Sequence, residues 1–589
     1  MLRISSFLAI TLVCLSFVEA ADKPNVVLVM TDDQGYGDLS CHGNPVLKTP
    51  NLDELYRESV RLTDYHVSPT CSPTRSALLT GHWTNRTGVW HTIMGRSLLR
   101  ENEVTLGQIF KDAGYATGMF GKWHLGDNYP YRPEDRGFTE VMRHGGGGVG
   151  QTPDFWDNAY FDGSYFHNSK AEPVKGFCTD VFFGYAKRFI KAQKAAGKPF
   201  LAYIVTNAPH GPMHAPESSS APYKNLNVGL ANFFGMIANI DDNVGCLREF
   251  LDDEDLTENT IFIFTTDNGS SSGWRTFNAG MRAGKGSEYD GGHRVPFFVH
   301  WPNGKLTGGR DVTRIAAHVD VVPTLIDLCG IASPKDVKFD GISIAPLLRN
   351  EIVTRWPARI LVTDSQRVKD PIKWRKSAVM TSQWRLINGK ELYDIKADPG
   401  QKKNVTAEYP KIVERLTNFY DRWWAELEPT FKQDCAIYLG HPAENPAVLT
   451  CHDWITTRST PWNHSHVRNA MTGKANTGFW NVKVVEDGEY EIRIRRWPKE
   501  ADAAIDASLP AGADVPGVQA YRARPGKAFP AVKATVSIAE QSAGLELPPG
   551  RKEVIFTMRL KAGTTRLSSR FIDAAGNEIG GYYAYVKKL

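Results

Sequence analysis

The run Cys71–Gly81 combines a reactive side chain with a short helix that can present it. Pro73 near the first turn and Gly81 as a stop predict a helix that begins close to Cys71. Cys71 then lies where the free N–H groups of a helix N-terminus favour an anion. These residues therefore predict a cysteine beside an anion-binding site, with a buried structural cysteine as the alternative.

Hard oxygen ligands form a second candidate group. Asp32 and Asp33 follow the apolar run 25–30, and Asp267 and Asn268 follow the run 261–266. Oxygen ligands without soft donors favour Ca²⁺ or Mg²⁺ over zinc or copper. Either pair alone would more often cap a helix or close a turn. Their shared position after core-type strands favours a metal site.

Basic side chains follow two more strand-like runs. Lys122 and His124 come after 116–120, and His210 comes after 199–205. Apolar runs that alternate with helical stretches predict an α/β fold with a largely parallel sheet. Ligands bind beyond the carboxyl ends of such strands, so we expect one site at one sheet edge.

The run Cys-x-Pro-x-Arg at 71–75 resembles the nucleophile motif of the type I sulfatases. Five further motifs lie in the family's order, at 31–37, 121–126, 208–210, 284–292 and 391–399. The resemblance covers roughly residues 22 to 430. It implies the alkaline phosphatase-like sulfatase fold, a large mixed, mainly parallel sheet flanked by helices, with a small C-terminal antiparallel subdomain.

The resemblance also implies a chemistry. In that family a maturation enzyme oxidises the cysteine to formylglycine (3-oxoalanine), whose aldehyde hydrate is the nucleophile. A hydrate oxygen suits a hard ion better than a thiolate does. The implied ligands of one Ca²⁺, or Mg²⁺, are Asp32, Asp33, the modified Cys71, Asp267 and Asn268.

Five more catalytic residues are carried over from the family, namely Arg75, Lys122, His124, His210 and Lys285. Arg75 would bind the hydrate, and the two lysines would neutralise the sulfate oxygens. His210 would protonate the leaving oxygen, and His124 would take the hydrate's proton. For each histidine the alternative is a packed core residue, and for Lys285 it is a solvated turn.

The segment 143–170 is predicted to be a flexible, aromatic and acidic insertion that lines a sugar subsite. It carries four consecutive glycines at 145–148. A surface loop that packs its own aromatics is the alternative. The candidate substrate contacts, here and further along the chain, are His144, Asp154, Trp156, His214 and Arg294.

The net charge and the N-terminal residues indicate where the protein acts and which partners are unexpected. The net charge of +4 without a long basic run makes nucleic acid an unexpected partner. Residues 1–20 read as a signal peptide, so we expect a secreted or periplasmic protein. No later apolar run is long enough for a membrane span. Cys14 would be removed with the signal peptide. Among the remaining cysteines, Cys435 and Cys451 are the candidate disulfide pair.

The predicted organisation is a catalytic domain at 21–355, its C-terminal subdomain at 356–430 and an appended β-sandwich at 435–589. Asp487-Gly488 predicts a hairpin, and Gly576-Asn577 predicts a last hairpin whose final strand carries Tyr583 and Tyr585. The sandwich would either bind glycan or buttress the catalytic domain, and buttressing is favoured.

Three functions fit these residues. The favoured one is a sulfatase acting on a sulfated glycan derived from a polysaccharide, with aryl sulfates as artificial substrates. A phosphohydrolase of the same superfamily is the runner-up, although the chain lacks the additional Asp/His ligand set expected of one. A catalytically dead glycan-binding protein is the third, and the intact candidate catalytic residues argue against it.

Overall fold

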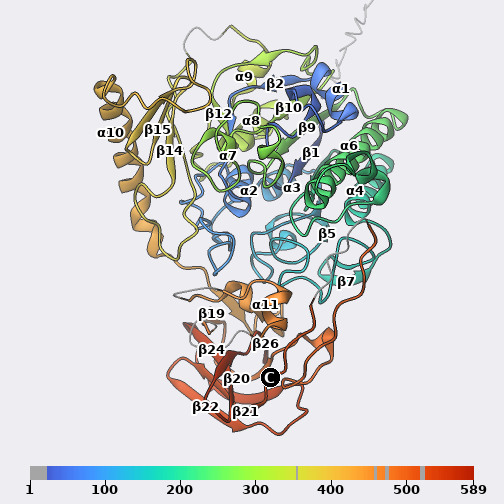
Figure 1. Cartoon of the computed structure of the whole chain (residues 1–589), viewed down its shortest axis with the longest axis vertical. Coiled ribbons are helices and arrows are strands. Elements are labelled where there is room, and N and C mark those ends of the chain that lie inside the picture. The colour runs from blue at the N-terminus through green and yellow to red at the C-terminus, as the bar shows by residue number, and fades with distance from the viewer. Residues whose placement is uncertain (1–22, 353–355, 457–459, 471–476, 518–523) are drawn as a thin grey trace, which may run out of the picture.

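The computed structural model describes residues 23–352, 356–456, 460–470, 477–517 and 524–589. The predicted signal peptide at 1–20 lies outside the described residues. Within them, no helix is long and apolar enough to cross a membrane. Figure 1 shows the α/β part at one end of the molecule and a β-sandwich, which carries the C-terminus, at the other.

A ten-stranded sheet organises the α/β part, in the order β11-β2-β10-β9-β1-β8-β4-β5-β6-β7. Its five central strands are parallel, and the remaining pairs are antiparallel except β11 with β2. The central strands are β9 (Thr260–Thr266), β1 (Asn25–Thr31), β8 (Phe200–Val205), β4 (Ala116–Gly121) and β5 (Glu140–Arg143). The outer strands are β11 (Asp311–Val312), β2 (Val60–Leu62), β10 (Phe297–His300), β6 (Ser164–His167) and β7 (Lys170–Pro173).

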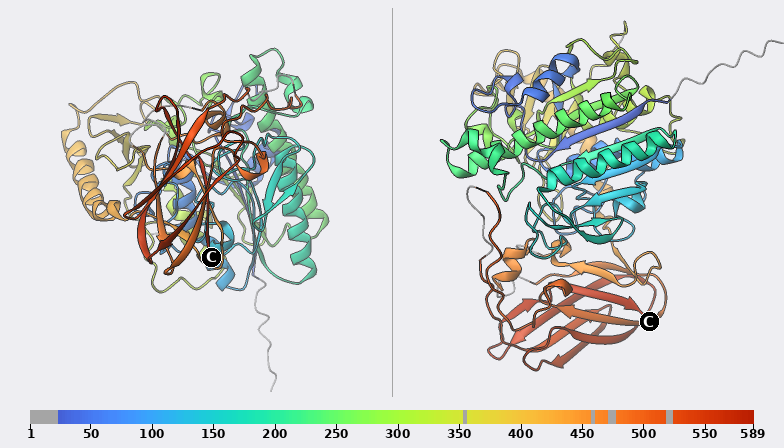
Figure 2. Two further views of the ribbon diagram at one scale, coloured as in Figure 1. Left: turned by 90° about the horizontal axis from the view of Figure 1, so that it is seen from below. Right: turned by 90° about the vertical axis from the view of Figure 1, so that its right-hand side faces the viewer.

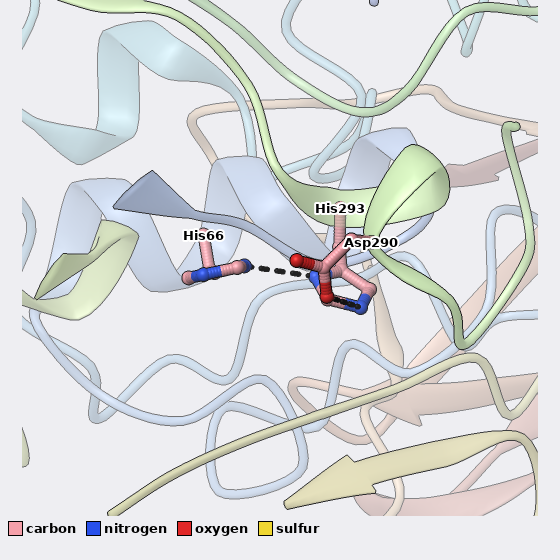
Figure 3. Close-up of side chains that lie close together, drawn as sticks. All are labelled: His66, Asp290 and His293. Atoms are coloured by element: carbon pink, nitrogen blue, oxygen red, sulfur yellow. Dashed lines mark hydrogen bonds and ion pairs between the residues drawn. The ribbon is translucent and has the colours of Figure 1, made fainter. Parts of the chain in front are cut away.

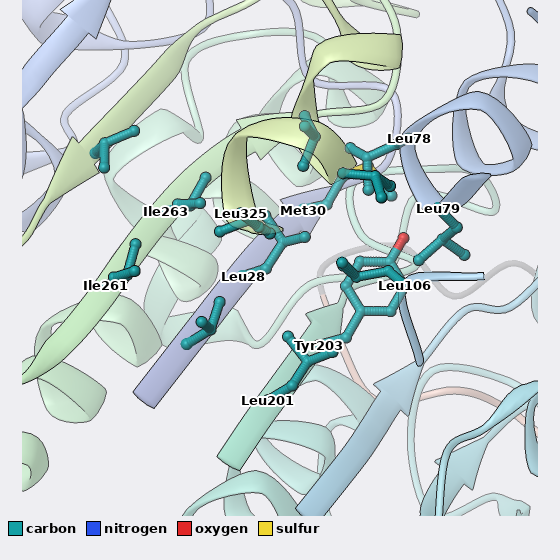
Figure 4. Packing of buried hydrophobic residues seen from close by; sticks show 14 of the residues in the cluster. Leu28, Met30, Leu78, Leu79, Leu106, Leu201, Tyr203, Ile261, Ile263 and Leu325 are labelled. Carbon is teal, nitrogen blue, oxygen red and sulfur yellow. The ribbon is translucent and has the colours of Figure 1, made fainter. Parts of the chain in front are cut away.

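Helices cover both faces of this sheet because its central strands are apolar on both sides. Every residue of β1 is buried, and alternate side chains point into two different hydrophobic clusters. One face packs α2 (Cys71–Thr80), α3 (Leu106–Asp112), α8 (Val321–Leu328) and α9 (Ala345–Leu348), as Figure 4 shows for α2 and α8. The other face packs α1 (Pro50–Glu58), α4 (Cys178–Ala195) and α6 (Val228–Asp253), and the right-hand view of Figure 2 shows the long helices α4 and α6 on the side facing the viewer.

A small antiparallel sheet and a long helix lie beside the main sheet. The strands are β13 (Leu361–Asp364), β14 (Ser377–Met380), β15 (Trp384–Ile387) and β16 (Glu391–Asp394), and the helix is α10 (Pro410–Leu427). Leu416 and Trp423 of α10 are buried in their shared cluster, as the helical spacing of apolar residues predicts. A two-stranded sheet of β3 (Tyr65–His66) and β12 (Ala316–Ala317) lies near the start of α2.

The C-terminal sandwich consists of two sheets around one hydrophobic cluster. The first sheet contains β17 (Ile437–Leu439), β19 (Trp480–Val484), β24 (Gly563–Asp573), β21 (Ala531–Ile538), β22 (Gln541–Glu546) and β25 (Glu578–Gly580). The second contains β18 (Ala447–Thr450), β26 (Tyr583–Lys588), β20 (Gly488–Arg495) and β23 (Val554–Leu560). The described sheets agree with the predicted fold class, while the exact domain boundaries stay predictions.

Three local predictions about this part were wrong. The turn at Asp487-Gly488 does not join a hairpin, because β19 and β20 belong to different sheets of the sandwich. Gly576-Asn577 does turn a hairpin, but its second strand is β25, and β26 with its tyrosines lies in the opposite sheet. All cysteines of the described chain are free thiols, Cys435 and Cys451 included.

Candidate active site

The parallel register gathers the predicted ligands at one edge of the sheet. β1 and β9 are neighbours, and their last residues, Thr31 and Thr266, are paired directly. The two polar pairs that follow them therefore begin side by side. On the other flank Gly121 of β4 pairs with Val205 of β8, and the Lys122 amide donates to the Val205 carbonyl over 2.8 Å. All four chain segments thus leave the sheet at the same end.

A buried acidic cluster lies at this edge. One ligand atom each from Asp32, Asp33 and Cys71 lie within 4.8 Å of one another, and all three residues are buried. The Asp33 amide donates to Asp267 Oδ1 over 3.2 Å, and Asn268 Nδ2 donates to Asp33 Oδ1 over 3.0 Å. The structure therefore brings together all five residues that the sequence predicts as ligands.

Two oxygens of this cluster, Asp32 Oδ1 and Asn268 Oδ1, are buried without a hydrogen-bond partner. A buried acceptor without a donor is costly unless a cation takes the donor's place. Burial, and next the charge of Asp267, raise the pKa of Asp32 well above its usual range, which a bound cation would counteract. The donor set fits a hard divalent ion.

The carboxylates of Asp32, Asp33 and Asp267 each have one basic partner, and that of Asp267 is Arg75. Lys122 Nζ lies 2.5 Å from Asp32 Oδ2, and Lys285 forms an ion pair with Asp33. Burial alone would raise the pKa of Asp33, but the Lys285 ammonium holds it far below the usual range. Lys285 Nζ also lies 3.7 Å from Cys71 Sγ. A cation therefore stands directly beside the candidate nucleophile.

Arg75 links the two flanks of the site. Its guanidinium donates twice to Asp267 Oδ2, over 2.7 and 3.1 Å, and once to the Lys122 carbonyl over 2.7 Å. It stands one turn along α2 from Cys71, and the helix ends at Gly81 with φ of 71°. The predicted helix and its stop are confirmed.

His124 is oriented as a proton acceptor. Its Nε2 donates to the Thr92 carbonyl over 2.8 Å, so the neutral ring carries its lone pair on Nδ1, which has no partner. Burial and the charge of Lys122 lower the pKa of His124 well below its usual range. This ring is neutral, with its base nitrogen free.

His210 stands at the opposite wall and lines a cavity. Its Nδ1 donates to the Gly211 carbonyl over 2.7 Å, which leaves Nε2 available. Burial, opposed by Asp33 and assisted by Lys285, lowers the pKa of His210 to about 3. An anionic substrate beside it would raise that pKa toward the range a proton donor needs.

The glycine-rich segment 145–148, called the glycine-rich lid below, is buried and packs against both histidines. A Cβ on Gly147 would lie 2.1 Å from His124 Cε1, and one on Gly148 would lie 3.3 Å from His210 Nδ1. The Gly147 amide donates to Gln151 Oε1 over 2.8 Å. Only glycine allows the backbone this close to the His124 ring.

Of the five predicted substrate contacts, His214 is the one that lines the cavity together with His210. His144 is buried, and its Nδ1 donates to the Gly145 carbonyl. Asp154, Trp156 and Arg294 are engaged elsewhere, as follows.

Asp154 accepts from the amides of Gly145 and Gly150 and so fixes the glycine-rich lid. Trp156 packs against His464 and Trp497 of the sandwich. Arg294 donates to the Thr63 carbonyl and lies over the Tyr36 ring. The structure does not bring these three side chains to the cavity.

Two residues of the site carry no signal in the sequence. His452, from the sandwich, lies with its ring centroid 6.0 Å from that of His124 and bonds to Gln151 Oε1 over 3.1 Å. Thr92 orients His124 through a carbonyl that every residue possesses. No local pattern marks either one, because each acts through a contact distant in sequence.

A second group with metal-ligand spacing consists of His66, Asp290 and His293, drawn in Figure 3. His66 Nδ1 lies 3.0 Å from His293 Nδ1. The buried Arg385 guanidinium donates to Asp290 over 2.9 Å and to Asp64 over 2.9 Å. A permanent cation already pairs with the carboxylate of this cluster, so the cluster fits a structural ion network that ties β15 to the segments 64–66 and 290–293.

Comparison with known proteins decides the family. Residues 24–331, more than half of the chain, match the family described as "Sulfatase", and residues 284–422 match "N-sulphoglucosamine sulphohydrolase, C-terminal". The chain belongs to the sulfatase family. This sulfatase is therefore an enzyme that hydrolyses sulfate esters, and the family match gives no support to the phosphohydrolase alternative or to a non-catalytic binding protein.

Individual relatives of this chain are also named as sulfatases. Arylsulfatase A of Homo sapiens is 32% identical over 501 residues, which cover 74% of this sulfatase and 94% of the relative. N-acetylgalactosamine-6-sulfatase of Canis lupus familiaris is 32% identical over 369 residues, covering 57% and 68%. The crystal structure of Ps i-CgsB in complex with k-i-k-neocarrahexaose superposes with a TM-score of 0.62 at 26% identity, covering 68% of this sulfatase and 92% of that chain.

Proposed function

We propose that this sulfatase hydrolyses sulfate esters of a carbohydrate, using a formylglycine hydrate made from Cys71 and one bound Ca²⁺. The observation that carries the proposal is the buried group of Asp32, Asp33 and Cys71, with ligand atoms within 4.8 Å and Lys285 beside the sulfur. A thiolate is a poor ligand for a hard ion, so this position is better suited to an oxygen nucleophile.

The ion would be held by Asp32, Asp33, Asp267, Asn268 and the modified Cys71. Asp32 Oδ1 and Asn268 Oδ1, buried without partners, are the oxygens it would satisfy. All-oxygen ligands favour Ca²⁺, with Mg²⁺ as the second choice. When bound, the ion supplies Lewis-acid polarisation of the sulfate oxygens and of the nucleophile.

The side chains then divide the proton transfers. One hydroxyl of the hydrate would give up its proton to water as its oxygen attacks sulfur, and the bond between sulfur and the ester oxygen would break. His210, protonated at Nε2 once the anionic substrate is bound, would deliver that proton to the departing oxygen. Nδ1 of His124 then takes the proton of the second hydroxyl, so that sulfate leaves and the aldehyde returns for rehydration by water. Lys122 and Lys285 hold the sulfate's negative charge throughout.

A carbohydrate substrate is supported by the cavity beside His210. Its volume of 330 Å³ is at the lower end of the range of about 300–1,000 Å³ for small-molecule sites. The structurally similar Ps i-CgsB was crystallised with k-i-k-neocarrahexaose, an oligosaccharide. We propose a sulfated, polysaccharide-derived glycan as the natural substrate and aryl sulfates as artificial ones.

We further propose export to the periplasm or the exterior, since residues 1–20 have the composition of a signal peptide. A maturation enzyme that forms formylglycine would be a protein partner of this sulfatase. The net charge of +4, without a basic run, gives no reason to expect nucleic acid binding.

Mass spectrometry of the peptide containing Cys71 tests the nucleophile. We expect the mass change that accompanies replacement of CH₂–SH by an aldehyde. Cys71→Ala should abolish sulfate release and leave the unfolding temperature close to that of the wild type, because a smaller side chain at a helix terminus removes little packing. Full turnover by an unconverted Cys71 enzyme would refute the proposal.

A further inference from the structure

The cavity beside His210 has walls from two parts of the chain. The catalytic part supplies the segment after the glycine-rich lid and the loop after β8. The C-terminal part supplies Trp462 and the short helix α11 (His464–Arg468). Figure 1 shows α11 at the junction between the sandwich and the α/β part.

Backbone hydrogen bonds fix this wall in place. The Thr152 amide donates to the Trp462 carbonyl over 3.0 Å, and the His464 amide donates to the Gly150 carbonyl over 3.0 Å. Gln151 and Asn463, which lie between these two hydrogen bonds, form a β-bridge. Trp462 therefore meets the catalytic part at a defined register, because its own carbonyl and the two residues that follow it are anchored there.

The lining has the composition of a site for an uncharged, hydroxyl-bearing ring. Trp462 is half-buried and lines the cavity, where its indole offers an apolar face. Three uncharged polar residues, Asn158, Asn463 and Ser465, line the same cavity, and side chains of these types can exchange hydrogen bonds with hydroxyl groups.

The charges on this wall further limit the class of ligand that the cavity can bind. Arg468 Nη2 donates to Asp157 Oδ1 over 2.7 Å, so the one fixed cation of this wall is already neutralised. Burial lowers the pKa of His464 to about 3, and its ring is neutral. The wall therefore offers no unbalanced positive charge for a second sulfate group.

We propose that Trp462, His464 and Arg468 of the C-terminal part line a subsite for the sugar ring that carries the scissile sulfate and no other charged group. The inference rests on the carbohydrate sulfatase function proposed above and assigns to the appended part a direct role in substrate binding. It is an alternative to the favoured expectation that the sandwich only buttresses the catalytic domain.

Product inhibition of the mature, calcium-loaded full chain separates this subsite from the sulfate site. A sulfated saccharide that the wild type turns over serves as substrate, and its sulfate-free sugar and inorganic sulfate serve as inhibitors. Trp462→Ala should raise the inhibition constant of the sugar by about tenfold, as expected when roughly 1.4 kcal/mol of contact is lost. The constant for sulfate should stay the same.

Two variants control for structure. Trp462→Phe keeps an apolar ring and should restore most of the sugar affinity. Tyr438 is also an aromatic of the sandwich in contact with the catalytic part, through Glu101, but it does not line the cavity. Tyr438→Ala should therefore leave both inhibition constants unchanged.

An unchanged sugar constant in Trp462→Ala, or an equal rise for sugar and sulfate, would overturn the subsite while leaving the carbohydrate sulfatase function intact. A wild type that turns over aryl sulfates but no sulfated saccharide would overturn both. An effect of Tyr438→Ala as large as that of Trp462→Ala would show that only the packing between the two parts matters.

Discussion

Replacing Gly147 by alanine should displace the base of the second half-reaction without altering any ionisable group. The added Cβ would lie 2.1 Å from Cε1, 2.2 Å from Nε2 and 2.7 Å from Nδ1 of His124. Ordinary contacts require well over 3 Å, so the ring or the lid must move by about 1 Å, a displacement that can cost about 10²-fold in rate. The bond from His124 to the Thr92 carbonyl is the contact we expect to break.

The adjacent glycine offers a matched control. A Cβ on Gly148 would meet its nearest neighbours, in Gln151 and His210, only at 3.3 Å, which small adjustments can relieve. Gly148→Ala should therefore lose only a few-fold in kcat. Both substitutions add one methyl group to the same buried lid, and comparable unfolding temperatures would show that both variants fold.

Rapid-mixing kinetics distinguish the affected step. If His124 acts after the alcohol has left, Gly147→Ala should give a burst of alcohol without matching free sulfate. Equal release of the two products would contradict the role of His124. A Gly147→Ala enzyme within a few-fold of wild-type kcat, or a Gly148→Ala enzyme equally impaired, would refute the geometric argument itself.

Three other outcomes are expected. A chelator should abolish activity, and Ca²⁺ should restore it better than Zn²⁺, because the ligands are hard oxygens; preferential rescue by zinc would contradict the site. His210→Ala should impair hydrolysis of sugar sulfates far more than that of nitrophenyl sulfate, whose leaving group needs no proton; equal impairment would contradict its role as acid. Arg385→Met should cost about 3–5 kcal/mol in urea unfolding, because Asp64 and Asp290 would be left buried without their cation. Adding Asp290→Asn to the Arg385→Met chain should recover part of that loss. A cost of Arg385→Met below about 1 kcal/mol would contradict a stabilising role of this ion network.

The sequence by itself determined the components of the active site and their approximate positions. Asp32, Lys122, His210 and Asp267 each follow the carboxyl end of an apolar run, and runs buried on both faces must lie inside a parallel sheet. The position of these residues at one edge of the sheet could therefore be predicted from the strands alone. Their catalytic roles rest on the resemblance to the sulfatases and stay predictions.

Only the tertiary structure decided what surrounds these residues. Asp487-Gly488 has hairpin composition, yet the strands beside it enter opposite sheets, since β19 pairs with β17 and β24 while β20 pairs with β23 and β26. His452 and Trp462 reach the site across more than 300 residues of chain. Such contacts depend on the packing of two hydrophobic cores against each other, and no periodicity or motif within either segment records them.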